Sequence, residues 1–65
     1  MRNYWLDFKV GDAVVIFADI GIFEGTIINI LYSKRYATIY VCEVIANGNI
    51  ETLNCVASVL EKKKS

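Results

Sequence analysis

Apolar residues along the chain fall into short segments, which glycines or charged residues separate from one another. The segments are rich in Val, Ile, Tyr, Phe and Thr, the residue types that favour β-strands. They predict strands over residues 13–18, 22–32, 36–45, 50–54 and 59–62. Asn47-Gly48 is the dipeptide most typical of a two-residue hairpin turn. Residues 55–58 predict one turn of 3-10 helix before the last strand.

The second of these segments has a helical alternative. Ile27, Ile28, Ile30 and Leu31 could form one face of a helix, but the segment is β-branched and lacks a capping box. We therefore predict a strand. Gly25 within it indicates a bend or a close approach of another backbone.

The third strand should have two largely apolar faces. One face holds Tyr36, Thr38, Tyr40, Cys42 and Val44, and the other holds Ala37, Ile39, Val41, Glu43 and Ile45. The second strand repeats this pattern, with Ile28, Ile30 and Tyr32 on one face and Phe23, Ile27 and Leu31 on the other. A half-exposed antiparallel strand normally alternates apolar and polar residues. We therefore expect one face to fill the core, and the other to be covered by a partner or by an N-terminal arm around Tyr4-Trp5.

Size and composition strengthen the expectation of association. A chain of 65 residues forms one small domain, here expected over residues 1–62 with a flexible basic tail at 63–65. Hydrophobic residues make up 55% of it, which is more than so small an interior can bury.

Charge argues against a domain that grips nucleic acid through its phosphates. Residues 1–60 hold four basic and six acidic side chains, a balance of −2, and the tail of Glu61 and Lys62–Lys64 restores a net charge of zero. The body therefore lacks the basic excess of such domains.

Localisation follows from charge spacing. Asp7, Lys9 and Asp12 interrupt any secretion signal, and no uncharged run approaches the roughly 20 residues that span a bilayer. We expect a cytoplasmic protein without membrane contact, in which Cys42 and Cys55 stay reduced.

The order of these signals resembles that of SH3-like barrels. Such barrels often show Gly-Asp before strand one, a glycine inside strand two, a long hairpin, a second hairpin and a 3-10 turn before strand five. The matching residues are Val10–Val14, Phe23–Ile27, Ala46–Asn49 and Val56–Leu60. The resemblance implies an all-β fold, a five-stranded SH3-like barrel with a short 3-10 turn, as in KOW and Tudor-like modules.

The layout is also similar to that of the plasmid type II dihydrofolate reductases, which are tetrameric SH3-like barrels. Gly11-Asp12, Gly25 and Val56–Glu61 carry this likeness. The family's Val-Gln-Ile-Tyr active-site stretch would fall near Ile50–Leu53, where Gln and Tyr are both missing, and its lysines after strand one have no match in Ile16–Ala18. The resemblance therefore implies self-assembly and does not carry over the reductase activity.

The sequence offers no evident catalytic, cofactor-binding or metal-binding residue. It has no His to act as a general base or to complete a zinc site, and its acidic residues are dispersed. We interpret Cys42 and Cys55 as small apolar filler. Four aromatics are candidates for a methyl-lysine cage and are interpreted instead as core or arm packing: Trp5, Phe17, Phe23 and Tyr40. We predict a protein that is not an enzyme and needs no cofactor.

Partner binding remains the best hypothesis, with a protein or a second copy of the chain as the partner. The candidate residues surround the central hairpin: Tyr32, Lys34, Arg35, Tyr36, Ile39 and Tyr40. Small barrels of this kind are common among phage and mobile-element proteins that modulate host machinery. The alternative is nucleic acid, because two cations between two tyrosines can neutralise a phosphate and stack a base.

Overall fold

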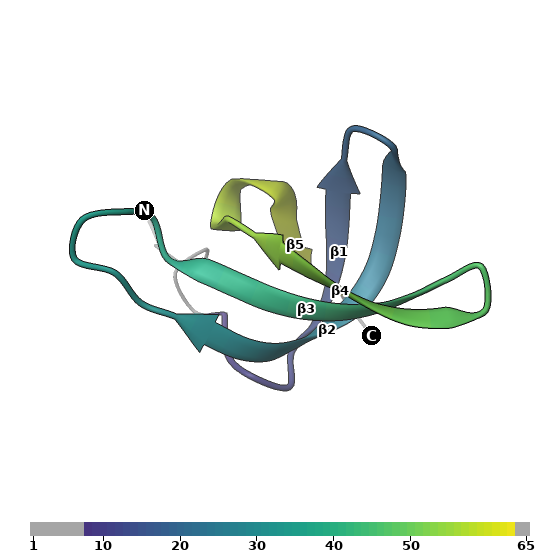
Figure 1. The fold of residues 1–65 in the computed structure, drawn as a ribbon, viewed down its shortest axis with the longest axis horizontal. Coiled ribbons are helices and arrows are strands. Elements are labelled where there is room, and N and C mark those ends of the chain that lie inside the picture. The colour runs from purple at the N-terminus through teal and green to yellow at the C-terminus, as the bar shows by residue number, and fades with distance from the viewer. Residues whose placement is uncertain (1–7, 64–65) are drawn as a thin grey trace.

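Five antiparallel strands form one curved sheet in the computed structural model, which describes residues 8–63 (Figure 1). The strands are β1 (Ala13–Ala18), β2 (Gly21–Leu31), β3 (Ile39–Ala46), β4 (Asn49–Cys55) and β5 (Leu60–Lys62), and a 3-10 turn, η2 (Ala57–Val59), precedes β5. Their order across the sheet is β4-β3-β2-β1-β5. The all-β prediction, the five strands and the late 3-10 turn are confirmed.

The start of the third strand differs from the prediction. β3 begins at Ile39 and not at Tyr36. The hydroxyl of Ser33 accepts hydrogen bonds from the backbone N–H groups of Arg35 and Tyr36, at 3.2 and 3.1 Å. A serine side chain that bonds nearby backbone in this way competes with the strand ladder. The connection between β2 and β3 is therefore longer than the sequence pattern indicated.

A β-bulge in β2 overturns the predicted assignment of its faces. The register with β3 shifts between Ile27 and Asn29, which places one extra residue in β2. An extra residue reverses the alternation of side chains beyond it. Ile27 is buried and Ile30 packs against the same core, although strict alternation put them on opposite faces. Ile28, at the bulge, is exposed.

Gly25 confirms the predicted close backbone approach. A Cβ atom at this position would lie 2.6 Å from the carbonyl oxygen of Glu43 and 2.7 Å from Cγ1 of Val44. Both atoms belong to β3, the strand that pairs with β2 at this point. Only glycine lets β2 and β3 approach this closely, and the helical alternative for this segment is wrong.

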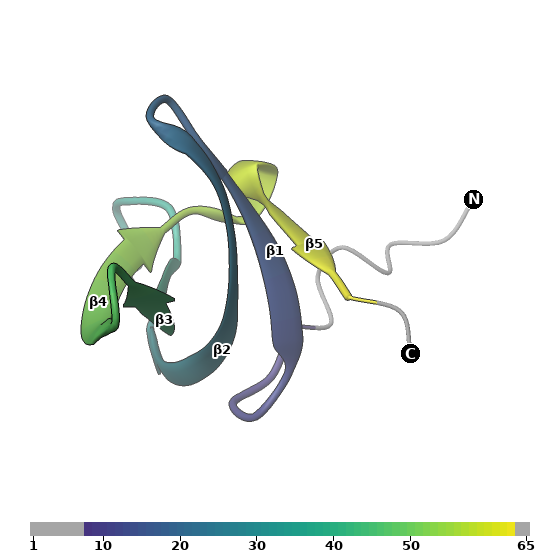
Figure 2. The same cartoon turned by 90° about the vertical axis from the view of Figure 1, so that its right-hand side faces the viewer.

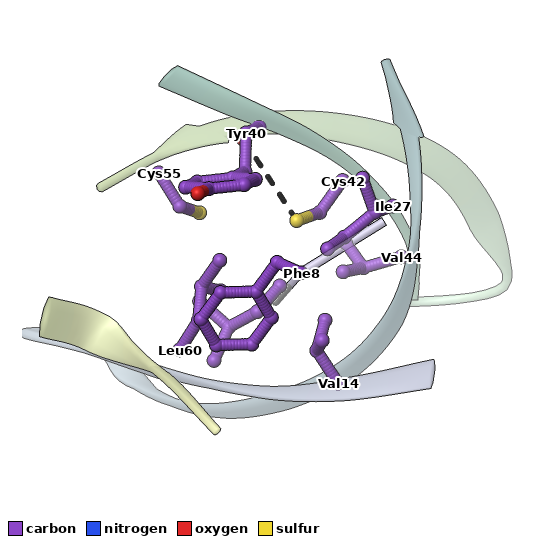
Figure 3. Packing of buried hydrophobic residues seen from close by; sticks show 9 residues of the cluster. Phe8, Val14, Ile27, Tyr40, Cys42, Val44, Cys55 and Leu60 are labelled. Carbon is purple, nitrogen blue, oxygen red and sulfur yellow. Dashed lines mark hydrogen bonds between the residues drawn. The ribbon is translucent and has the colours of Figure 1, made fainter. Parts of the chain in front are cut away.

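The core lies inside the curve of the sheet (Figure 3). Its buried members come from every strand and from Phe8, which precedes β1: Phe8, Val14, Ile16, Ile27, Tyr40, Cys42, Val44, Cys55 and Leu60. Phe8 meets Tyr40 edge to face with ring centroids 5.3 Å apart. This aromatic pair connects the residues before β1 to the far half of the sheet.

The sheet is open in the structure. β4 and β5 are its two edges, and Figure 2 shows β3 and β4 on one side of the curve and β1 and β5 on the other. Within residues 8–63, β4 pairs only with β3 and β5 pairs only with β1. Closure into a barrel is therefore not observed.

The structure tests the predictions for the two chain ends only in part. The Tyr4-Trp5 arm lies in residues 1–7, and Lys64 and Ser65 follow the described range, so these positions lie outside the described residues. Lys63, expected in the tail, donates its backbone N–H to the carbonyl of Ala13 and continues the contact between β5 and β1. Among the described residues, no helix has the length and apolar character needed to cross a membrane.

Candidate functional site

The outward face of the sheet is defined by β3. Tyr40, Cys42 and Val44 are buried, and the alternate positions Ile39, Val41, Glu43 and Ile45 lie on the other face. Residues paired across antiparallel strands share a face. The register of β3 with β2 and β4 therefore assigns the outward side chains of those strands as well.

Three apolar cross-strand pairs lie on this outward face. Phe17 pairs with Ile22, Leu31 with Ile39, and Ile45 with Ile50. Each pair stands near the turn of one of the three successive hairpins, and we call them the hairpin-tip pairs. The Ile45–Ile50 pair is the most exposed, with relative exposures of 73% and 68%. Apolar side chains are thus exposed at the perimeter of the sheet.

The middle of the outward face is more polar. Glu43 lies between Thr26 of β2 and Thr52 of β4, and Val41 lies between Asn29 and Asn54. The apolar surface is therefore divided among the hairpins and does not form one continuous sheet face.

The structure brings five of the six predicted partner residues to the surface around one hairpin. Tyr32 and Tyr36 are 81% and 76% exposed, and Lys34 and Arg35 lie exposed between them. Ile39 is half-buried and pairs with Leu31 next to this loop. The loop thus presents two aromatic rings, two cations and an apolar pair together.

Tyr40 is the exception, and its assignment as a partner-binding residue is corrected. Its side chain is only 7% exposed and contacts Phe8 in the core. The strand alternation that turns Ile39 outward turns Tyr40 inward. Phe23, another cage candidate, also packs against the core, whereas Phe17 belongs to a hairpin-tip pair.

The basic C-terminal segment is partly neutralised. The Nζ atom of Lys62 lies 3.6 Å from a carboxylate oxygen of Asp12, and that of Lys63 lies 2.7 Å from a carboxylate oxygen of Glu24. Asp12 also accepts a hydrogen bond from the backbone N–H of Lys9. Two of the three lysines in the run therefore face carboxylates of the same chain, which lowers their attraction for phosphates.

The two free cysteines point into the core from neighbouring strands (Figure 3). Burial, and to a smaller extent the neighbouring Cys55, raise the pKa of the Cys42 thiol to about 11. Burial also raises the pKa of Cys55. The Cys42 thiol donates to the carbonyl of Tyr40 at 3.8 Å. Both groups are therefore protonated at neutral pH, whereas a nucleophilic cysteine needs a lowered pKa.

A shallow cleft of about 310 Å³ lies where the ends of β1 and β4 face each other across the open side of the sheet. Its lining is mainly apolar: Ile16, Phe17, Ala18, Asp19, Leu53, Asn54, Cys55 and Val59. Within residues 8–63, no group of three or more Cys, Asp or Glu side chains comes together as a metal site would require. The cleft therefore offers shape and apolar contact, with Asp19 as its charged side chain.

No known protein family, curated protein or solved structure matches this chain. The geometry of its own residues must carry any functional conclusion. In that geometry, sequence reasoning missed the pairs Phe17–Ile22 and Ile45–Ile50 as candidate binding residues. The signal that could have found them is their position next to the predicted turns. Near its turn a hairpin extends beyond the core, so apolar side chains there stay uncovered.

Proposed function

We propose that this chain is a non-enzymatic protein-binding module, built on a small SH3-like barrel, that binds a second copy of itself or a partner protein. The hairpin-tip pairs are the observation that carries the proposal. Five of the six side chains in these pairs are exposed, and each pair places two apolar side chains side by side on one small domain.

The composition of these pairs suits a protein partner. Protein interfaces are enriched in aromatic and aliphatic side chains at their centres, with charged groups moved to the rim. Ile45 and Ile50 carry no charge, and the polar residues Asn47 and Asn49 border them at the turn. Covering such a pair removes apolar area from water at a gain of about 25 cal/mol per Å².

The order of the strands supports the SH3-like part of the proposal. An SH3-like barrel requires β1 to pair with both β2 and β5, and β2 to continue into a β2-β3-β4 meander. Both features are present in this sheet, together with η2 before β5. The shallow cleft at the ends of β1 and β4 lies where the two halves of such a barrel would meet.

The proposal is tested by affinity capture from a lysate of the source organism, before and after nuclease treatment. The immobilised baits are the wild-type chain, Ile45→Lys, Ile22→Lys and the control Lys34→Ala. Ile22 and Ile45 are exposed, so a lysine at either position leaves the core intact. We expect a nuclease-resistant protein to be retained by wild type and by Lys34→Ala, and to be reduced at least about tenfold by one of the isoleucine variants.

Capture of a protein that both isoleucine variants and the control retain equally would contradict the proposed surface. Capture that is lost on nuclease treatment would contradict a protein partner altogether. Retention of the chain itself, and of no other protein, would select the self-association arm of the proposal.

Nucleic acid is the second candidate, and one observation favours it. Tyr32 and Tyr36 both present their rings to solvent on either side of Lys34 and Arg35. Base stacking on such rings contributes about 1–3 kcal/mol per base. If this loop binds nucleic acid, a fluorescent single-stranded oligonucleotide binds with a salt dependence that the double variant Lys34→Ala, Arg35→Ala reduces. Absence of binding at low salt removes this candidate.

A further inference from the structure

The outer edge of β4 lacks the features that usually block a strand edge. Native proteins protect edges by making them short, by placing lysines or prolines on them, or by covering them. β4 is seven residues long, Glu51 is its only charged residue, and it contains no proline. Within residues 8–63, no strand pairs with its outer edge.

The turn before β4 determines which backbone groups face outward. Asn47 and Gly48 have φ angles of 54° and 79°, as in a type I′ turn, and they join the paired residues Ala46 and Asn49. The pair that flanks such a turn is hydrogen-bonded, and bonded pairs then alternate along the ladder.

Alternation assigns the remaining residues of β4. Glu51, Leu53 and Cys55 bond to β3, because each lies an even number of residues after Asn49. Ile50, Thr52 and Asn54 therefore direct their N–H and carbonyl groups away from β3. These three residues present a regular row of unpaired backbone groups at the edge of the sheet.

We infer that this edge pairs, antiparallel, with β4 of a second copy of the chain, about a two-fold axis that passes between the two Thr52 residues. Ile50 then bonds to Asn54 of the second copy, Thr52 to Thr52, and Asn54 to Ile50. All three outward residues find partners, which gives about six backbone hydrogen bonds. The two five-stranded sheets become one continuous sheet.

Charge and hydrogen bonding select this register over its neighbours. An axis at Glu51 places two carboxylates directly opposite each other, which is destabilising. An axis at Leu53 leaves Ile50 without an outward partner in β4. With the axis at Thr52, Glu51 lies opposite Leu53 of the second copy, and no like charges meet.

A second copy suits this edge for two reasons. The chain has zero net charge, so two copies do not repel each other at long range. The outward-bonding residues Ile50, Thr52 and Asn54 are all uncharged. Because a single strand pairing buries a small area, we expect weak dimerisation, with a Kd on the order of 100 μM.

Two threonines provide a matched test by sedimentation velocity. Thr26 and Thr52 are both exposed and both pair with Glu43 on the outward face, but Thr26 lies on an inner strand of the sheet. Thr52→Lys places two lysines at the proposed axis, and Thr26→Lys does not. We expect Thr52→Lys to raise the dimer Kd at least about tenfold and Thr26→Lys to change it less than about twofold.

Thr52→Pro provides a second variant that acts through the backbone. It removes an N–H that faces away from β3, so the β3–β4 ladder stays intact, and we expect it to abolish the dimer. Equal effects of Thr26→Lys and Thr52→Lys, or a dimer that Thr52→Pro leaves intact, would overturn the inference.

Residue-resolved amide exchange gives an independent readout. Between about 20 μM and about 1 mM protein, the amides of Ile50, Thr52 and Asn54 should become protected, whereas those of Glu51 and Leu53 are protected at both concentrations. Protection of the three outward amides that is independent of concentration would overturn a dimer and indicate cover from within the chain.

This inference rests on the proposed protein-binding function. The experiments distinguish a failure of the β4 dimer from a failure of that function. A chain that stays monomeric at about 1 mM overturns the β4 dimer. If Ile22→Lys or Ile45→Lys still reduces capture of another protein at least about tenfold, the binding function survives that result. If the chain stays monomeric at about 1 mM and neither Ile22→Lys nor Ile45→Lys reduces capture, both proposals fail.

Discussion

The two edge strands of the sheet are held by different means. β5 has three residues and pairs with only Val14–Ile16 of β1. It is secured by Leu60, which is 8% exposed in the core, and by the ion pairs of Lys62 and Lys63. β4 has seven residues that pair along almost the whole of β3. It is secured by this ladder and by the side chain of Cys55, which meets the core beside Cys42.

The difference shows that a small sheet can protect one of its edges against pairing and leave the other available. Charged residues at β5 tie it to its own chain and disfavour pairing with another. The longer ladder of β4 needs no such charges for its own retention. Its outer backbone groups can therefore serve another strand, and the consequences of each arrangement can be measured separately.

The largest expected effect comes from a matched pair of leucines. Leu60→Ala removes a buried side chain that joins β5 to the core, and we expect the free energy of unfolding to fall by about 2–4 kcal/mol. Leu53 of β4 is half-buried and lines the cleft. Leu53→Ala should therefore cost about 1 kcal/mol. Urea unfolding at low protein concentration measures both.

The order of these two effects is the discriminating result. A larger loss for Leu53→Ala would mean that β4 depends on its side chains for retention more than β5 does. The comparison of the two edges would then be wrong.

Alkaline pH should weaken the β3–β4 side of the molecule. The pKa of Cys42 rises from 9 to about 11 on folding, so the unfolded chain releases its proton first as the pH increases. Stability from this group is complete below pH 9 and is lost between pH 9 and pH 11, by as much as about 2 kcal/mol. Urea unfolding at several pH values measures it.

The control for this prediction is Cys42→Ala, which removes the thiol. The loss of stability between pH 9 and pH 11 should be smaller in this variant than in wild type, whatever its stability at pH 8. Identical pH dependence in the two proteins would show that the Cys42 thiol is not the group responsible.

The smallest expected effect is the response of β5 to salt. The Lys63–Glu24 pair is exposed at both side chains, and exposed pairs contribute about 0.2–1 kcal/mol. Lys63→Ala should lower the free energy of unfolding by an amount in this range at low salt. At about 1 M NaCl the difference from wild type should vanish, because charges are then screened within a few ångströms.

The matched control for this pair is a variant that removes the charge of the partner carboxylate, Glu24→Gln. Glu24→Gln should reproduce the effect of Lys63→Ala, and the double variant should be no worse than either single one. Additive effects would mean that the two side chains act independently of each other.

Much of the fold follows from local sequence signals. The limits of β1 were predicted from residues 13–18, and the Asn47-Gly48 turn was predicted from its dipeptide alone. Of the two alternatives predicted for Gly25, a bend or a close backbone approach, the structure shows the close approach. The first two features depend on residues that are adjacent in sequence. The third depends on glycine, the one residue type without a Cβ atom to block the approach of another backbone.

The misassigned residues have long-range causes. Tyr40 was predicted both as a core residue and as a partner-binding residue, and the register of β3, which buries it against Phe8, supports only the first. Ile27 and Ile30 both reach the core because a bulge in β2 lies between them. The candidate loop itself was found from its polar residues, whereas two of the three hairpin-tip pairs were missed.

The sequence by itself determined the strands, their turns, and the excess of apolar residues over what one small core can bury, because propensity and composition act locally and additively. Only the tertiary structure decided which of two apolar faces turns inward, where the alternation of β2 reverses, and which strands form the edges. Those outcomes depend on the register between strands that are distant in sequence, since a shift of one residue exchanges the two faces of a strand. The unequal edges of this sheet are therefore a property of its assembly, and β4 and β5 cannot be distinguished as edges until the whole sheet has formed.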